Sequence, residues 1–355
     1  MYEVIVLGAG QAGLAAGYHL HNQKLDYVIL EASEQTAGSW PKYYDSLTLF
    51  SPVQYSSLPG MDIPGGPDHY PTKDEVVRYL NQYREHFNLN VQTTKKAVEV
   101  TKNNGVFSVK TEDGMIYQAR AVICATGAFN DPYVPDITGN QIFEGRIIHS
   151  YQYRHQEPFA GERVVVVGGR NSAVQIAVEL AQVADVSLAT RTPIKYMPQR
   201  LLGRDGHFWG RLIGYDTFPI GLWFHVRDKE PVIDTGEFKK AIEVDQNPDQ
   251  RSMFTRFTKN GVEWADGRTE RVDSVVFATG FKPKLRYLEP LQAVDEEGYP
   301  LQKGGISTTV PGLYYIGLHW QRNHASATIR GVGPDAKYVL KRLKKYLDSH
   351  RSLDV

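Results

Sequence analysis

The chain opens on a continuous apolar run, YEVIVL at residues 2–7, which leads into the glycine-rich stretch GAGQAG. Such a run, without alternation of polar residues, predicts a strand buried on both faces. The following LAAGYHLHNQ predicts a helix, and YVIL at 27–30 predicts a second strand that ends on Glu31. Glycines in the order G-x-G-x-x-G between such elements, with an acidic residue about 20 positions on, indicate a nucleotide-binding unit.

A second unit repeats this layout from residue 163, with RVVVV, the turn GGRNSA, the helical VQIAVELAQV and the strand VSLAT. Arg191 follows Gly168 by 23 residues (191 − 168), and Glu31 follows Gly8 by the same number (31 − 8). This spacing predicts one structural position that holds an acid in the first unit and a base in the second. A carboxylate suits the free ribose of FAD or NAD, whereas a guanidinium suits the 2′-phosphate of NADP. The plainer interpretation of Arg191 is an exposed charge at a strand end.

The remaining pattern completes an α/β fold with two Rossmann-like dinucleotide-binding domains. KDEVVRYLNQYREHF at 73–87 predicts an amphipathic helix, and residues 91–119 predict a β-meander inserted in the first domain. AVICATG and SVVFATGF predict matching strands that close the two units, and GVGPDAKYVLKRLKKYL predicts a last helix preceded by Gly331 and Gly333, whose N-terminus faces the flavin. The expected first domain, for FAD or NAD, comprises 1–160 and 272–355, and the expected second domain, for NADPH, comprises 161–271. Within it, the aromatic- and glycine-rich segment 197–228 is either a substrate lid or the outer wall of the domain.

Composition narrows the function classes. Forty basic and forty acidic residues give a net charge of zero, which argues against a broad nucleic-acid or membrane surface. The single cysteine, Cys124, excludes an internal disulfide and a redox dithiol, and its apolar surroundings indicate a buried small side chain. The two closely spaced histidine pairs, His19 with His21 and His319 with His324, lack carboxylate or cysteine neighbours, so we expect no metal site. No apolar run reaches the length of a membrane span, and the immediate first strand leaves no room for a signal peptide. We therefore expect a cytoplasmic enzyme.

The chain resembles the flavin-containing monooxygenases. FEGRIIHSYQY fits their fingerprint F-x-G-x-x-x-H-x-x-x-[FY] through Phe143, Gly145, His149 and Tyr153, just before the second glycine turn. FATGF is similar to the family's FATGY strand, and the small bacterial CzcO-like flavoproteins are the most similar branch. The resemblance implies FAD and NADPH as cofactors. It also implies oxygenation of a soft nitrogen or sulfur centre of a small molecule by O₂, through a flavin C4a-hydroperoxide. In such an enzyme the flavin carries the chemistry, so we assign no catalytic side chain and interpret His149 as structural.

The resulting candidate cofactor residues fall into two groups. Those expected at FAD are Gly8, Gly10, Gln11, Ala12, Gly13, Glu31, Ala32, Gly38, Ser39, Trp40, Phe50, Thr126, Gly127, Gly317 and Gln321. Those expected at NADPH are Gly168, Arg170, Asn171, Ser172, Thr190 and Arg191.

Two positions depart from the family pattern. Arg170 stands where a turn of this type usually has its middle glycine. We expect its positive charge to replace the close approach of the backbone to the pyrophosphate. Phe50 occupies the place where the family often has an asparagine beside the flavin, which predicts a leaky oxygenase. Two alternatives stay open: an NADPH oxidase or reductase without productive oxygen transfer, and a flavin-binding protein that turns over nothing. A homodimer is a candidate assembly, and no nucleic-acid partner is expected.

Overall fold

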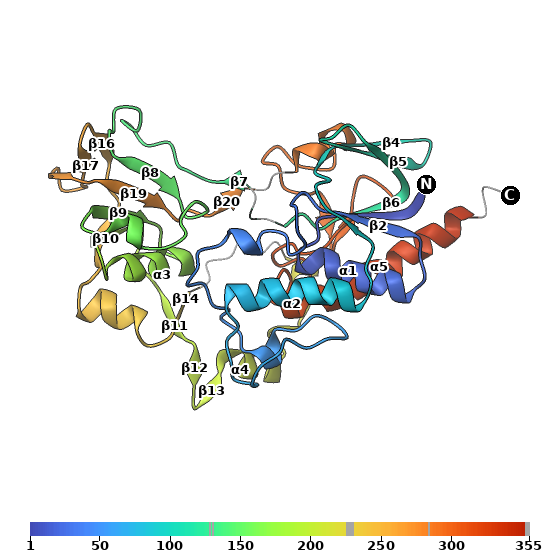
Figure 1. The fold of residues 1–355 in the computed structure, drawn as a ribbon, viewed down its shortest axis with the longest axis horizontal. Coiled ribbons are helices and arrows are strands. Elements are labelled where there is room, and N and C mark those ends of the chain that lie inside the picture. Colours follow the sequence, from blue (N-terminus) through green and yellow to red (C-terminus); the bar gives the residue numbers. More distant parts are fainter. Residues whose placement is uncertain (128, 130, 225–230, 283–284, 352–355) are drawn as a thin grey trace.

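Two α/β lobes, each built on its own parallel sheet, make up the computed structural model (Figure 1). The structure describes residues 1–127, 129, 131–224, 231–282 and 285–351. The short strands β7 (Asp131–Pro132) and β20 (Phe281–Lys282) pair antiparallel and lie between the lobes.

The first sheet has the parallel order β3-β2-β1-β6-β23, in which β1 is central. Its strands are β1 (Tyr2–Leu7), β2 (Tyr27–Leu30), β3 (Val91–Gln92), β6 (Ile116–Cys124) and β23 (Leu313–Tyr315). The antiparallel strands β4 (Ala97–Asn103) and β5 (Val106–Thr111) pair onto β6, and β21 (Gln302–Lys303) and β22 (Ile306–Ser307) extend the sheet beyond β23. The predicted meander is confirmed for β4, β5 and β6.

Both faces of the first sheet are covered, which explains the unbroken apolar run of β1. Val4 and Val6 pack with helices α1 (Gln11–Asn22), α2 (Lys73–His86) and α5 (Ile329–Arg351). Ile5 and Leu7 point to the other face, where β5 and the 3₁₀ helix η6 (Arg286–Leu291) cover them. The predicted helix at 73–87 is confirmed. In contrast, α5 begins at Ile329, so Gly331 and Gly333 lie inside its first turns and do not precede it.

The second sheet has the parallel order β15-β10-β9-β19-β8. Its strands are β8 (Arg146–His149), β9 (Arg163–Val167), β10 (Asp185–Thr190), β15 (Asp249–Ser252) and β19 (Ser274–Phe277). Helix α3 (Asn171–Leu180) covers one face, and the small sheet β16 (Arg256–Thr258), β17 (Gly261–Glu263), β18 (Thr269–Arg271) lies toward the other. Since β8 and β19 lie outside the expected range 161–271 yet pair in this sheet, the second unit is larger than expected.

A long excursion leaves the second sheet after β10. It contains β11 (Tyr196–Pro198), β12 (Arg200–Leu201), β13 (Arg204–Asp205), α4 (Gly206–Leu212), η4 (Ile220–Leu222) and β14 (Val232–Asp234). β12, β13 and α4 lie together at the lower edge of the view, below both sheets (Figure 1). The remaining elements are the 3₁₀ helices η1 (Trp40–Lys42), η2 (Val53–Tyr55) and η3 (Glu157–Phe159), and the π-helix η5 (Lys240–Val244).

His149, the histidine of the family fingerprint, ties the second sheet to the strands between the lobes. It ends β8, is 2% exposed, and its Nε2 lies 2.9 Å from the carbonyl oxygen of Gly280, next to β20. Its Nδ1 accepts a hydrogen bond from the Tyr151 amide at 3.0 Å. Because Nδ1 accepts, Nε2 carries the proton and the ring is neutral. Burial lowers the pKa of His149, and the hydrogen bond to Gly280 partly offsets this effect. The interpretation of His149 as a structural residue between the domains agrees with these contacts.

We predict that His149 makes the fold sensitive to mild acid. Its pKa is lowered in the folded state, so its contribution is complete above the unfolded pKa of about 6.5 and is lost as pH falls below that value. Between about pH 7.5 and 5.5, the free energy of unfolding should fall by up to about 1.4 kcal/mol more in the native protein than in His149→Gln. Chemical denaturation at the two pH values measures this difference. Equal losses in both proteins would show that His149 does not titrate on unfolding.

Candidate functional site

The first glycine turn brings strand β1 and helix α1 together at a distance that excludes side chains. Gly8 has φ +98°, and a Cβ at Gly13 would lie 1.8 Å from the Gly8 carbonyl oxygen. Gly10 is different, because a Cβ there would meet nothing nearer than the Gly38 Cα at 3.8 Å. Packing therefore requires Gly8 and Gly13, whereas the protein leaves the space beside Gly10 open. That space is where the pyrophosphate of a dinucleotide approaches the backbone in this type of turn.

The N-terminus of α1 is equipped to bind an anion. Gly10 is its N-cap and has extended backbone, with no side-chain cap and no acidic residue in the first turn. The first amides of a helix lack intrahelical partners and carry a partial positive charge. The Gln11 side chain receives a hydrogen bond from the Trp40 indole at 2.8 Å and donates one to the Ala327 carbonyl at 3.2 Å. This amide thus connects α1, the loop at η1 and the segment just before α5.

Glu31 is buried and stabilises the turn itself. Its Oε2 accepts a hydrogen bond from the Ala9 amide at 2.6 Å, and its Oε1 accepts one from the Ser33 amide at 2.8 Å. Each carboxylate oxygen has a further lone pair that can accept a ribose hydroxyl. Ala32, the next candidate, is exposed at the end of β2.

Several other FAD candidates converge on the same end of the sheet. A Cβ at Gly38 would lie 3.0 Å from the Gly10 Cα, and one at Gly317 would lie 2.8 Å from the Ala12 Cβ. Ser39 is the N-cap of η1, directly before Trp40. Thr126 Oγ1 lies 3.0 Å from the Tyr287 hydroxyl, a partner that the sequence pattern did not indicate. Gly127 has φ +72° and open space beside it.

Two further FAD candidates have hydrogen-bond partners that are not themselves FAD candidates. Gln321 is fully buried, and its Oε1 accepts a hydrogen bond from the Leu318 amide at 3.3 Å. Its Nε2 is buried and has no hydrogen-bond partner among the described residues, so contact of Gln321 with FAD stays a prediction. Phe50 is half-buried, and its carbonyl accepts a hydrogen bond from Gln199 of the second unit at 3.3 Å.

The second turn accommodates Arg170 without strain. Arg170 is the N-cap of α3 with φ −117° and ψ −179°, and Gly10 caps α1 with φ −75° and ψ −171°. Both are extended conformations that any residue adopts. The position that requires glycine is Gly168, which has φ +145° and whose Cβ would lie 2.6 Å from the Ala278 carbonyl oxygen. Arg170 is exposed at the N-terminus of the helix, so its charge adds to that of the helix amides.

Strand register corrects the predicted match between Glu31 and Arg191. Leu7 pairs with Leu30 in the first sheet, and the corresponding Val167 pairs with Ala189 in the second. Thr190, not Arg191, therefore occupies the position of Glu31. The equal spacing was misleading because the second unit is one residue shorter between these paired positions.

The environment of Thr190 and Arg191 still suits a phosphorylated ribose. Thr190 is buried and accepts a hydrogen bond from Gln250 at 2.9 Å, so the acid of the first unit is absent from this position. Arg191 is exposed at the end of β10. Among the residues that the structure describes, its guanidinium has no hydrogen bond or ion pair.

The other two NADPH candidates are engaged in contacts that the sequence did not indicate. Asn171 Oδ1 accepts a hydrogen bond from the Ile233 amide at 2.9 Å, which fastens β14 to the start of α3. Ser172 hydrogen-bonds the Tyr44 hydroxyl, which also contacts Gln175. Tyr44 comes from the first lobe. Its contacts with Ser172 and Gln175 therefore form a seam, that is, a contact region between the two nucleotide units. The sequence did not indicate this contact, because the loop that carries Tyr44 has no motif and is far from Ser172 along the chain.

Other chemistry receives little support. Burial raises the pKa of Cys124 to about 12, which disfavours a reactive thiolate. The described part of the chain contains no group of three or more histidine, cysteine, aspartate or glutamate side chains that could hold a metal ion. It also contains no helix long and apolar enough to cross a bilayer.

Fold and site together define an oxidoreductase with two dinucleotide-binding units. The family model described as pyridine nucleotide-disulphide oxidoreductase matches residues 5–201, and the chain belongs to this family. Within it, the chain is 35% identical to the uncharacterized oxidoreductase CzcO of Bacillus subtilis (strain 168), over 97% of this chain and 99% of that protein. It is 29% identical to the probable indole-3-pyruvate monooxygenase YUCCA8 of Arabidopsis thaliana, over 88% and 83% of the two chains.

A solved structure supports the same class of protein. The flavin-containing monooxygenase from Stenotrophomonas maltophilia superposes with a TM-score of 0.85 at 32% identity, covering 97% of this chain and 98% of that one. The comparisons confirm the expected CzcO-like family, the α/β fold and a flavin-dependent oxidoreductase that uses FAD and a pyridine nucleotide.

Replacement of two glycines by alanine should separate packing from ligand binding. Gly13→Ala should lower the free energy of unfolding of the apoprotein by about 2 kcal/mol or more, because its Cβ collides with backbone. Gly10→Ala should cost less than about 1 kcal/mol but weaken FAD binding at least about tenfold, because its Cβ enters the ligand's space. Denaturant titration and flavin fluorescence quenching measure the two effects. Unchanged FAD affinity in Gly10→Ala would refute the assignment of this turn.

Proposed function

We propose that the protein is an FAD-dependent, NADPH-using monooxygenase that oxygenates soft nitrogen or sulfur centres of small molecules. The observation that carries the proposal is the pair of turns. Each has a helix N-terminus capped by an extended residue, Gly10 or Arg170, directly beyond the carboxyl end of a central parallel strand. This is the end of a parallel sheet at which nucleotides bind.

The first turn is the proposed FAD site. The open approach at Gly10 and the free amides of α1 suit the pyrophosphate, and the remaining lone pairs of Glu31 suit the ribose. Trp40 and the segment before α5, both fastened to Gln11, would border the flavin end. When bound, FAD supplies the redox chemistry and the activation of O₂ that amino-acid side chains do not provide.

The second turn is the proposed NADPH site. Arg170 and the α3 amides would face the pyrophosphate, and Arg191 would face the 2′-phosphate. Thr190 places no anion beside that phosphate, whereas a carboxylate such as Glu31 would repel it. A single charge-assisted contact is worth roughly 1.5–3 kcal/mol, so the expected preference for NADPH over NADH is substantial but not absolute.

An aromatic series runs from Trp40, beside the first turn, to Phe281 between the lobes, and it favours an apolar substrate. Ring centroids lie 5.6 Å apart for Trp40 and Tyr43, 6.1 Å for Tyr43 and Phe129, and 5.3 Å for Phe129 and Phe281. Phe281 in turn lies 5.0 Å from the His149 ring. Such side chains exclude water and bind apolar groups. The rings of Trp40, Tyr43, Phe129 and Phe281 carry no group that is basic at neutral pH, which agrees with chemistry carried by the cofactor and a substrate atom that is itself nucleophilic.

The two alternatives differ from this proposal in their products. An NADPH oxidase would convert all consumed O₂ to H₂O₂, and a flavin-binding protein without turnover would consume no NADPH. The similarity to a flavin-containing monooxygenase over nearly the full length supports oxygen transfer.

Turnover with a panel of small sulfides and tertiary amines tests the proposal. We expect sulfoxide or N-oxide together with much H₂O₂, because the apolar ring of Phe50 offers no hydrogen bond to the reacting groups. Phe50→Asn should shift the ratio of organic product to H₂O₂ upward by about threefold or more, since even a weak hydrogen bond of about 1 kcal/mol changes a rate about fivefold. Phe50→Leu is the matched apolar control and should leave the ratio low. H₂O₂ as the sole product across the panel, from the native protein and the asparagine variant alike, would favour the oxidase.

A further inference from the structure

The part of the excursion from β12 to Phe224, just after η4, exposes many large apolar side chains. We define its outer face as the exposed large apolar side chains that it carries: Leu201, Leu202, Leu212, Ile213, Phe218, Trp223 and Phe224. Leu202 is 82% exposed, Ile213 76% and Phe224 69%. Exposed apolar clusters of this kind mark interaction sites in soluble proteins.

Short-range hydrogen bonds order the segments that carry the outer face. The Trp209 indole of α4 donates a hydrogen bond to the Leu201 carbonyl at 3.0 Å, which joins the β12–β13 hairpin to the helix. The Phe218 amide bonds to the Gly214 carbonyl at 2.9 Å, and the Phe224 amide bonds to the Ile220 carbonyl at 3.0 Å. The hairpin and α4 lie at the lower edge of the view, below both sheets (Figure 1).

The opposite side of the excursion is fixed to the first lobe by its two acids. Asp216 is buried, and its carboxylate accepts hydrogen bonds from Arg330 at 3.0 and 3.1 Å and contacts His324 at 3.1 Å. Asp205 is also buried; it accepts a hydrogen bond from the Tyr70 hydroxyl at 2.7 Å and caps α4 through the His207 amide. The apolar outer face is therefore held outward by a well-anchored inner side.

This arrangement leaves the outer face with charges of one sign. Between residues 197 and 224, Asp205 and Asp216 are the two acids, and both face inward, whereas Arg200, Arg204 and Arg211 are exposed. At the border, the exposed Asp68 lies 3.9 Å from Arg200. The chain's net charge of zero therefore conceals a local cluster of arginines among leucine, isoleucine and aromatic side chains.

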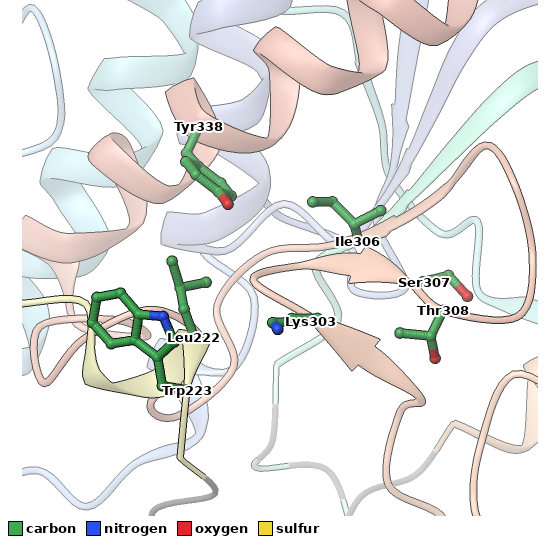
Figure 2. Close-up of a pocket in the computed structure, with 7 residues that line it drawn as sticks. All are labelled: Leu222, Trp223, Lys303, Ile306, Ser307, Thr308 and Tyr338. Atoms are coloured by element: carbon green, nitrogen blue, oxygen red, sulfur yellow. The ribbon is translucent and has the colours of Figure 1, made fainter.

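A shallow pocket of about 330 Å³ continues the outer face toward α5 (Figure 2). Leu222 and Trp223 form one side of it, and Tyr338 of α5 and Ile306 line it further. Its one lysine, Lys303, is exposed and has no ion pair within the described part of the chain. The pocket adds a fourth cation and more apolar surface to the same region.

We propose that the outer face docks on an anionic lipid surface. Large apolar and aromatic side chains interleaved with arginines are suited to insert below charged headgroups while the cations contact them. A second copy of this chain is a poorer occupant, because a twofold contact of this face with itself would bring arginines against arginines. The proposal concerns peripheral attachment and does not depend on which reaction the flavin site catalyses.

Co-sedimentation of the FAD-loaded protein with vesicles tests the proposal. We expect binding to vesicles of phosphatidylcholine and phosphatidylglycerol in equal parts, weak binding to phosphatidylcholine alone, and loss of binding at high salt. Arg204→Gln with Arg211→Gln should weaken partition by about fivefold for each arginine. Leu202→Ser with Ile213→Ser should weaken it by about tenfold or more. Retained flavin absorbance shows that each variant is folded.

Matched controls lie on the far lobe and on the meander. Arg268→Gln with Arg271→Gln removes two similarly exposed arginines, and Met115→Ser with Ile116→Ser removes two exposed apolar side chains. Both controls should bind like the native protein. Absence of binding to the anionic vesicles, or binding that the outer-face variants retain, would overturn the proposal. A dimer in light scattering that does not bind vesicles and that Leu202→Ser with Ile213→Ser dissociates would also overturn it, and would assign the face to a second copy.

Discussion

The first nucleotide site depends on the close approach of helix α1 to strand β1. This approach leaves room for the glycine hydrogens but for no larger group. A Cβ at Gly13 would stand 1.8 Å from the Gly8 carbonyl oxygen, so the helix can begin directly above the strand. That position directs the amides of its first turn to the open space beside Gly10. The Glu31 carboxylate, through the Ala9 amide, secures the intervening residue. A packing constraint thereby becomes an anion-binding site.

The second unit reaches a similar geometry with different residues. Its turn keeps the left-handed Gly168 but has Ala173 where the first has glycine, and it begins α3 on the extended Arg170. We expect side-chain charge at the helix N-terminus to offset the loss of close backbone approach. The seam through Tyr44 and Ser172 ties this turn to the first lobe, so the two sites are parts of one assembly.

Much of this was predictable from the sequence, and the failures have physical causes. Apolar runs and glycine order predicted the central strands and both turns, because burial on two faces and left-handed backbone leave few choices of residue. The predicted match of Arg191 to Glu31 was wrong by one residue. The spacing from the glycine includes the helix and its connections, and this segment is one residue shorter in the second unit. The second sheet gained β8 from an earlier segment, which no local pattern encodes. Contacts such as Asn171 with Ile233, or Thr126 with Tyr287, join residues distant in sequence and become visible in the fold.

The central claim is that two turns of related design hold different nucleotides, the first FAD and the second NADPH. The most direct measurement is the anaerobic rate at which NADPH and NADH bleach the flavin of the native protein and of Arg191→Ala, with the exposed Arg268→Ala as control. The account predicts faster bleaching at low NADPH than at equal NADH, by about one to two decades, and near parity in Arg191→Ala. Equal rates with the native protein, or a flavin that neither nucleotide reduces, would contradict it.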